Sequence, residues 1–201
     1  VGSEMCIRDS IKMDVPSLDD TMPDNERLTR AITEATGMQI VRIPYAVMKK
    51  LAVVLRESNF DVQVVWRKNA NDVFVYDVLP KDKPAVVAGL AVDIGTTTVS
   101  AIIINMLDGS ILAKGSSGNG QIRYGADVIN RIIESVKPGG SERLPKAVIE
   151  ETINPLIDTM CRQAKISHNS IYRMSVASNT TMNHLLFGLN GDSIRTEPYI
   201  P

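Results

Sequence analysis

One stretch of the sequence, residues 89–100, constrains the fold more than any other. It reads GLAVDIGTTTVS, an apolar segment that ends in one acid, one glycine and three threonines before β-branched residues resume. The pattern predicts a strand, a tight loop at 93–97 and a second strand at 98–106. A turn at 107–110 and an apolar run at 111–115 follow. We therefore expect three consecutive antiparallel strands.

Each residue type in this loop suits contact with phosphate. Gly95 permits a close backbone approach or a positive φ, so successive N–H groups can surround phosphate oxygens. Thr96, Thr97 and Thr98 would add hydroxyl donors. Asp93, at the end of its strand, would hold Mg²⁺ through water or orient a nucleophile at a γ-phosphate. The alternative is an ordinary hairpin turn.

The rest of residues 85–201 predicts helices that alternate with one further strand. A helix with apolar residues at 128, 129, 132 and 133 comes first. A long helix then starts at Pro145 and is kinked or divided at Pro155. Residues 171–177 predict a buried strand, which is followed by a short helix that begins with Asn179, Thr180 and Thr181. The order β-β-β-α-β-α indicates an α/β fold.

Residues 11–80 predict a separate small α+β module. Residues 11–30 contain two prolines and many acids, which is typical of a linker that leads into a helix capped at Asp24 or Asn25. A second helix begins at Pro44, and two strands flank a turn at 69–72.

We divide the chain at the junction LPKDKP, residues 79–84, into a middle module at 31–82 and a second domain at 85–201. Residues 1–10 lack an initiator Met and resemble translated vector or adapter sequence, so we leave them, including Cys6, out of the functional interpretation.

Composition narrows the functional classes. The 22 Lys and Arg residues balance 23 Asp and Glu residues, so no overall field favours nucleic acid or an anionic membrane. The longest apolar run, 85–92, falls well short of the ~20 residues of a membrane span. Two distant cysteines predict neither disulfides nor a four-thiolate cluster, and they indicate a cytoplasmic protein. His168 and His184 lack a paired ligand for zinc, and Cys161 falls on an apolar helical stripe.

Three segments in the same order, DIGTTTVS, NGQIRYGADVINRI and SNTTMNHLLFGL, resemble the ATP-dependent reductive activators of corrinoid proteins. These activators belong to the ASKHA superfamily of acetate and sugar kinases, heat-shock ATPases and actin. The resemblance implies a ribonuclease H-like nucleotide-binding fold. Residues 85–201 would form the first half of that domain, truncated before the second phosphate motif, and we expect the isolated chain to bind ATP weakly or not at all.

The resemblance also implies the activity. Such proteins use ATP to drive the reduction of a Co(II) corrinoid to Co(I), with the electron supplied by a two-iron two-sulfur domain that these residues do not contain. The implied cofactors are ATP and Mg²⁺, and the implied partners are a corrinoid protein of a methyltransferase system and a second copy in a homodimer. The implied site comprises Asp93 as the catalytic residue and Mg²⁺ ligand, with Gly95, Thr96, Thr97, Thr98, Gln121, Asn179, Thr180 and Thr181 at the nucleotide.

Within the second and third segments, the residues also permit simpler roles. Gln121 could orient a water molecule, whereas Asn179 and its two neighbours could equally form an ordinary helix cap. For Asp127 and Arg131 we favour a helix cap and a solvated salt bridge.

Three other functions share parts of this pattern. A sugar-kinase-like phosphotransferase would use the same phosphate loop. An activator of acyl-CoA dehydratases would need cluster cysteines in the nucleotide domain, where only Cys161 is available. The third, non-enzymatic alternative is a scaffold or interaction domain with a vestigial nucleotide fold.

Overall fold

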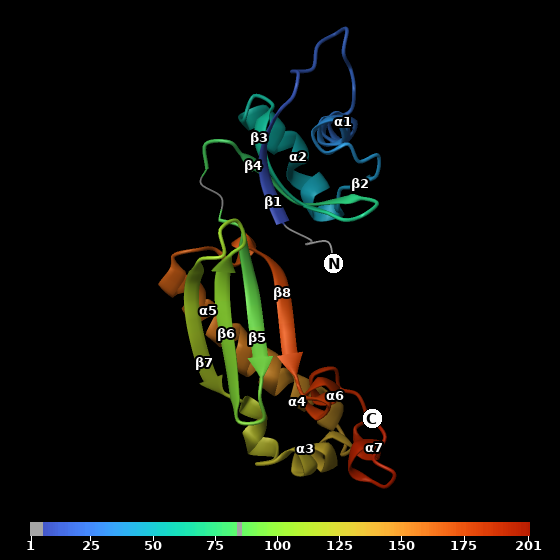
Figure 1. The fold of residues 1–201 in the computed structure, drawn as a ribbon, viewed down its shortest axis with the longest axis vertical. Helices are drawn as coiled ribbons and strands as arrows, with labels where there is room; N and C mark the ends of the chain where they lie inside the picture. Colours follow the sequence, from blue (N-terminus) through green and yellow to red (C-terminus); the bar gives the residue numbers. More distant parts are fainter. Residues whose placement is uncertain (1–5, 84–85) are drawn as a thin grey trace. The chain divides into compact units, whose positions relative to one another are not determined.

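A computed structural model describes residues 6–83 and 86–201 of the 201-residue chain. The chain forms two compact units (Figure 1). The first unit extends to Val87 and includes Met106–Asp108, whereas the second comprises Ala88–Asn105 and Gly109–Pro201. Each unit contains one four-stranded sheet. The division falls beside the predicted junction, of which residue 84 lies outside the described residues.

The sheet of the first unit has the strand order β1-β3-β4-β2. Its centre is the predicted hairpin, formed by β3 (Asp61–Lys68) and antiparallel β4 (Val73–Pro80). The short β2 (Val41–Arg42) is parallel to β4. The remaining strand, β1 (Cys6–Lys12), pairs with β3, although no element was predicted there. Residues 1–5 lie outside the described residues.

Two amphipathic helices complete the first unit, α1 (Asp24–Thr36) and α2 (Tyr45–Glu57). Helix α1 begins at Asp24 and ends before Gly37, whose φ of 73° is the left-handed conformation that favours glycine at a helix end. The predicted helix start near Asp24 is confirmed, but the predicted cap is wrong, because Pro23 precedes the helix and no side chain caps it. The first two residues of the predicted linker at 11–30 belong to β1. Helical and strand side chains share one core: Leu28, Ile32, Leu51, Leu55, Val62, Val64, Trp66 and Val75, among others.

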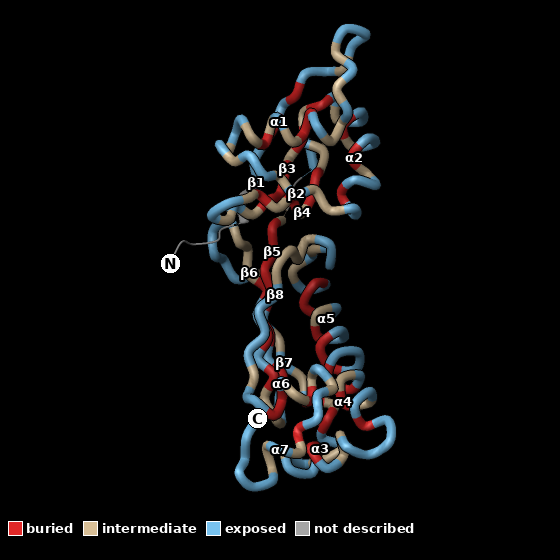
Figure 2. Tube along the Cα trace, turned by 90° about the vertical axis from the view of Figure 1, so that its right-hand side faces the viewer, coloured by how far each residue is buried: buried red, intermediate tan, exposed pale blue. Residues whose placement is uncertain are grey.

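The sheet of the second unit has the order β7-β6-β5-β8. The predicted antiparallel strands are confirmed as β5 (Ala88–Ile94), β6 (Thr98–Asn105) and β7 (Ile111–Gly118). Strand β8 (Ile171–Ser178) is parallel to β5. The prediction that this strand is buried is wrong: β8 forms an edge of the sheet, and its residues 174–177 are exposed (Figure 2).

Helix α5 (Asn154–Ala164) packs across one face of this sheet against β6 and β7, whereas α3, α4, α6 and α7 gather at the end of the sheet where β5 and β8 end (Figure 1). Cys161 is buried within α5, as its apolar stripe predicted. Along the chain the helical elements are η1 (Gly120–Tyr124), α3 (Val128–Ser135), α4 (Gly140–Val148), a π-helical turn (Ile149–Ile153), α5 (Asn154–Ala164), η3 (His168–Ser170), α6 (Thr180–Leu186) and α7 (Asp192–Arg195).

Three details of these helices differ from expectation. Pro145 lies inside α4 rather than at its start, because the helix already begins at Gly140. Pro155 divides the long helix as predicted, but a π-helical turn precedes it. In α3 only Ile132 of the predicted apolar face is fully buried, whereas Ile129 and Ile133 are exposed. Among the described helices, none combines the length and the apolar character that crossing a membrane requires.

Candidate phosphate-binding site

The candidate site lies at the carboxyl end of the parallel pair β5 and β8. Ile94, the last residue of β5, pairs with Ser178, the last residue of β8. The loop predicted at 93–97 is shorter in the structure, because residues 93 and 94 belong to β5; residues 95–97 follow this strand, and Asn179 at the start of α6 follows β8. Ligands of α/β sheets commonly bind where parallel strands end. The topology therefore brings these two predicted segments to the same edge.

Loop 95–97 is tight because its two ends are joined by hydrogen bonding. The Gly95 N–H donates to the Thr98 carbonyl oxygen at 3.0 Å. A Cβ atom on Gly95 would lie 2.7 Å from that same oxygen. Glycine is required here by a close backbone approach, not by a positive φ, which was the other possibility that the sequence left open.

All three carbonyl groups of the loop face the protein interior. The Asn119 side-chain amide donates to the Gly95 carbonyl oxygen at 2.9 Å, and the Asn119 N–H donates to the Thr97 carbonyl oxygen at 2.8 Å. The Arg131 guanidinium donates to the Thr96 carbonyl oxygen at 2.6 Å. Asn119 and Arg131 are both buried, so they hold the loop from its interior side.

The amide groups of the loop consequently face outward. In a trans peptide the C=O and N–H bonds point in opposite directions, so an inward carbonyl on one residue turns the next N–H away from the interior. The N–H groups of Thr96 and Thr97 have no hydrogen-bond acceptor among the described residues. Two adjacent outward amides without an acceptor are available to donate to an anion.

Asp93 lies beside this loop, on the exposed face of the sheet. It pairs with Ser100 of β6 and with Ala177 of β8, and its neighbours Val92 and Ile94 point to the buried face. Its carboxylate borders a shallow hollow of about 270 Å³. A carboxylate at this position is accessible to a hydrated cation that accompanies an anion at the loop.

The threonine side chains differ in their access to solvent. Thr97 and Thr98 are exposed and Thr96 is half-buried, which leaves their hydroxyl groups available at the loop. On α6, Thr180 is exposed and Thr181 is buried. The Asn179 side chain accepts a hydrogen bond from the Met182 N–H at 2.8 Å, which is the ordinary helix cap that the sequence allowed as an alternative.

Gln121, like Thr181, is a predicted site residue that is buried. Its side chain is buried, and its amide nitrogen donates to the Leu144 carbonyl oxygen at 2.9 Å. Its backbone N–H donates to the Asn119 side-chain oxygen at 2.9 Å. In this arrangement Gln121 supports Asn119 and joins η1 to α4, rather than orienting a water molecule at the loop.

The sequence interpretation did not predict that Arg131 contacts the loop. The expected solvated salt bridge with Asp127 is wrong, because Arg131 is fully buried and Asp127 caps α3 by accepting from the Asn130 N–H at 2.8 Å. Burial lowers the pKa of the Arg131 guanidinium, although arginine stays charged in proteins. A signal was present in the sequence, since Arg131 lies three residues after Val128 and adjoins the apolar stripe of its helix.

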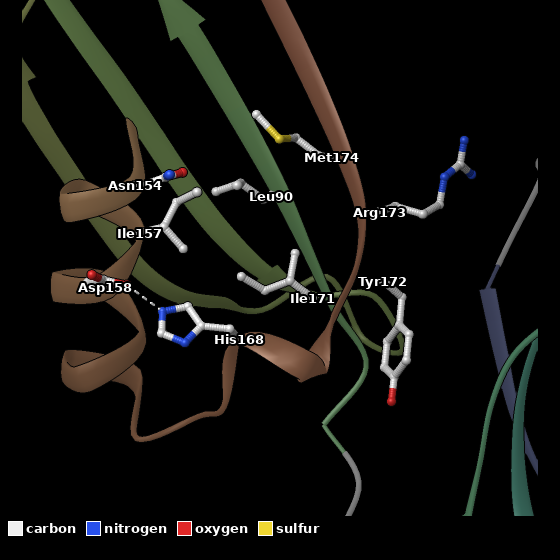
Figure 3. A pocket seen from close by; sticks show the side chains of 9 residues that line it. All are labelled: Leu90, Asn154, Ile157, Asp158, His168, Ile171, Tyr172, Arg173 and Met174. Carbon is white, nitrogen blue, oxygen red and sulfur yellow. Dashed lines mark ion pairs between the residues drawn. The ribbon is translucent and has the colours of Figure 1, made fainter. Parts of the chain in front are cut away.

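A second cavity in the same unit is lined by none of the residues of this site. It measures about 630 Å³ and is lined largely by Leu90, Ile157, Ile171 and Met174 (Figure 3). At its edge His168 forms an ion pair with Asp158 at 2.7 Å, as the dashed line in Figure 3 marks. Within residues 6–83 and 86–201, no cluster of three or more His, Cys, Asp or Glu side chains could hold a metal ion.

Comparison with known proteins relates both units to one family. A family model described as the RACo middle region matches residues 88–201, and one described as the RACo linker region matches residues 7–85. The corrinoid activation enzyme RamQ of Eubacterium limosum is 35% identical over 131 residues, which make up 63% of this chain and 21% of RamQ.

A solved structure described as a reductive activator for corrinoid, iron–sulfur protein matches with a TM-score of 0.81 at 34% identity. The match covers 99% of this chain and 32% of that one. This chain therefore spans about a fifth of the curated relative and about a third of the solved structure.

Proposed function

Because this chain belongs to the RACo family, we propose that it takes part in the ATP-dependent reductive activation of a corrinoid protein. In this reaction one electron converts Co(II) to Co(I) in a corrinoid protein of a methyltransferase system. A two-iron two-sulfur cluster elsewhere in the full-length protein supplies the electron, and ATP supplies the free energy. The second unit contributes phosphate binding.

The observation that carries this proposal is the orientation of loop 95–97. Its carbonyl groups are held inward by Asn119 and Arg131, and the N–H groups of Thr96 and Thr97 face outward at the end of a parallel strand pair. This arrangement suits the β- or γ-phosphate of a nucleotide, because oriented backbone amides bind phosphate oxygens in many nucleotide-binding proteins.

In this proposal, the residues of the site have different roles at the nucleotide. The outward amides and the exposed hydroxyls of Thr97 and Thr98 bind phosphate oxygens, and Thr180, exposed on α6, offers a further hydroxyl. Asp93 is the residue that would hold Mg²⁺, which would supply positive charge to neutralise the phosphates. Binding energy that differs between the ATP and ADP states then drives docking and release of the corrinoid protein.

Cys161 counts against the related acyl-CoA dehydratase activators as an alternative. A cluster shared between two subunits needs accessible thiolates, whereas Cys161 is 2% exposed and burial raises the pKa of its thiol. The names of the relatives favour corrinoid activation over a sugar-kinase-like phosphotransferase.

The proposal is tested by the ATP-dependent recovery of methyltransferase activity, with the full-length protein and a corrinoid protein oxidised to Co(II). We expect Asp93→Asn to slow this recovery by roughly 100-fold, because it removes the carboxylate that positions Mg²⁺ and the nucleophile. Asp158→Asn is the matched control, since that aspartate is exposed in the same unit but pairs with His168 away from the loop.

Two outcomes would contradict the proposal. If the activity of the wild-type protein does not depend on ATP, the proposed nucleotide function is wrong. An Asp93→Asn protein that matches the Asp158→Asn control would leave ATP dependence intact but would remove Asp93 from the reaction.

A further inference from the structure

We infer that Arg131 is a positioning residue that sets the affinity of loop 95–97 for nucleotide phosphates. It acts through its hydrogen bond to the Thr96 carbonyl and through a positive charge that has no carboxylate partner among the described residues. The inference rests on the proposed function, because it names the residue behind the phosphate loop of that same site.

The contacts of Arg131 join three segments of the second unit. Besides the Thr96 carbonyl oxygen at 2.6 Å, its guanidinium donates to the Gly125 carbonyl oxygen at 2.8 Å and contacts the Met182 sulfur at 3.5 Å. Its exposed fraction is 0%. Because all three partners are electrically neutral, the guanidinium is fixed in position without being neutralised.

The nearest acid does not compensate this charge. Asp127 favours the charged guanidinium from a distance, but its two carboxylate oxygens accept hydrogen bonds from the Asn130 N–H at 2.8 Å and the Asn130 side-chain amide at 2.9 Å. No ion pair to Arg131 is formed by any carboxylate that the structure describes. A buried charge that lacks a counter-ion favours the approach of an anion.

The Thr96–Thr97 peptide group transmits this charge to the outer side of the loop. The carbonyl of that group accepts from Arg131, and its N–H belongs to Thr97, which has no acceptor among the described residues. Hydrogen bonds in a chain polarise one another, so the contact with Arg131 makes the Thr97 N–H a stronger donor to phosphate.

Arg143 offers a matched comparison in the neighbouring helix. Its guanidinium donates to the Glu134 carboxylate at 2.8 Å and to the Pro138 carbonyl oxygen at 2.7 Å. It makes a similar number of contacts in the same unit, but its charge is paired and none of these contacts involves the loop.

The test is calorimetric titration of the full-length protein with MgATP and, separately, with adenosine. We expect Arg131→Met to weaken MgATP binding by about 10- to 100-fold, the effect of losing a hydrogen bond to a charged group, with adenosine binding unchanged. Arg131→Lys retains the charge but cannot reach both carbonyl groups, so it should fall between wild type and Arg131→Met. Arg143→Met should bind both ligands like wild type.

Several results would overturn the inference. One is MgATP binding by folded Arg131→Met within about twofold of wild type; another is an equal loss of MgATP and adenosine affinity, which indicates a merely structural role. If Arg131→Met does not fold, Arg131→Lys decides: weaker MgATP binding with unchanged adenosine binding supports the inference, and unchanged MgATP binding contradicts it. A wild-type protein that binds adenosine and MgATP equally well would instead contradict the proposed phosphate site itself.

Discussion

At the scale of single residues, Gly95 is the position where the loop has least space. A Cβ atom there would lie 2.7 Å from the Thr98 carbonyl oxygen, and backbone atoms cannot move aside as a flexible side chain can. We expect Gly95→Ala to open the loop and to weaken MgATP binding by the full-length protein by at least about tenfold, because misdirected amides lose their contacts with phosphate.

Gly118 provides the control for this substitution. It ends β7, and a Cβ atom there would have no neighbour within 4 Å. Gly118→Ala should therefore leave MgATP binding unchanged in the same titration. If both alanine variants bind MgATP equally well, the close approach at Gly95 has no part in phosphate binding.

At the scale of secondary-structure elements, the π-helical turn between α4 and α5 joins the helices to the loop region. The N–H of Asn154 donates to the Ile149 carbonyl, five residues earlier. Thr152 within the turn donates to the Ala147 carbonyl oxygen at 2.8 Å and accepts from the Gly120 N–H at 3.0 Å. The buried Thr152 hydroxyl thus connects the turn to η1, the element that follows Asn119.

We expect Thr152→Val to lower the free energy of unfolding of the second unit by about 1–3 kcal/mol, because the part-buried Gly120 N–H and the buried Ala147 carbonyl lose this partner. Urea denaturation followed by circular dichroism measures the change. Thr159→Val is the control: its exposed hydroxyl donates to the Pro155 carbonyl and accepts from the exposed Arg162 guanidinium, both at 3.0 Å, so no buried group loses a partner and the effect should stay within about 0.5 kcal/mol. Equal effects of the two substitutions would contradict this role of the π-helical turn.

The same elements show which parts of the fold could be predicted from sequence patterns. The hairpin around residues 69–72 and the three antiparallel strands follow from local alternation and turn residues, so they could be predicted. The exposure of β8 could not, because an apolar strand has the same pattern at the edge of a sheet as at its centre. The π-helical turn was also missed, although Pro155 correctly marked a break.

The candidate site was predictable to a similar depth. The residue types of loop 95–97 favour the phosphate-binding hypothesis, because their chemistry is local, and that hypothesis stays a prediction. The roles of Arg131 and Gln121 depend on burial by segments distant in sequence, Thr96 in one case and Leu144 in the other. Such partners cannot be inferred from one amphipathic helix or one short loop.

At the scale of the whole molecule, the two units contain separate cores. Leu28 lies in the core of the first unit and Leu144 in that of the second, and both are 0% exposed. We expect two unfolding transitions for this 201-residue chain, because each sheet keeps its own buried face. Differential scanning calorimetry measures both transitions.

Leucine truncation in each core assigns the transitions. Leu28→Ala and Leu144→Ala should each destabilise one unit by about 2–5 kcal/mol through the cavity they leave, and should lower the temperature of different transitions. A single transition that both substitutions lower equally would instead mean that the units unfold as one.

Folding, rather than ligand binding, orients the peptide dipoles of loop 95–97. Asn119 and Arg131 are part of the core of the second unit, and they hold the loop carbonyls before any anion arrives. An anion that binds there meets a preorganised set of donors, so little conformational entropy is lost in ordering the backbone. The stability of the fold and the affinity of the loop for an anion therefore depend on the same hydrogen bonds. Substitutions of Asn119 or Arg131 should change both quantities together.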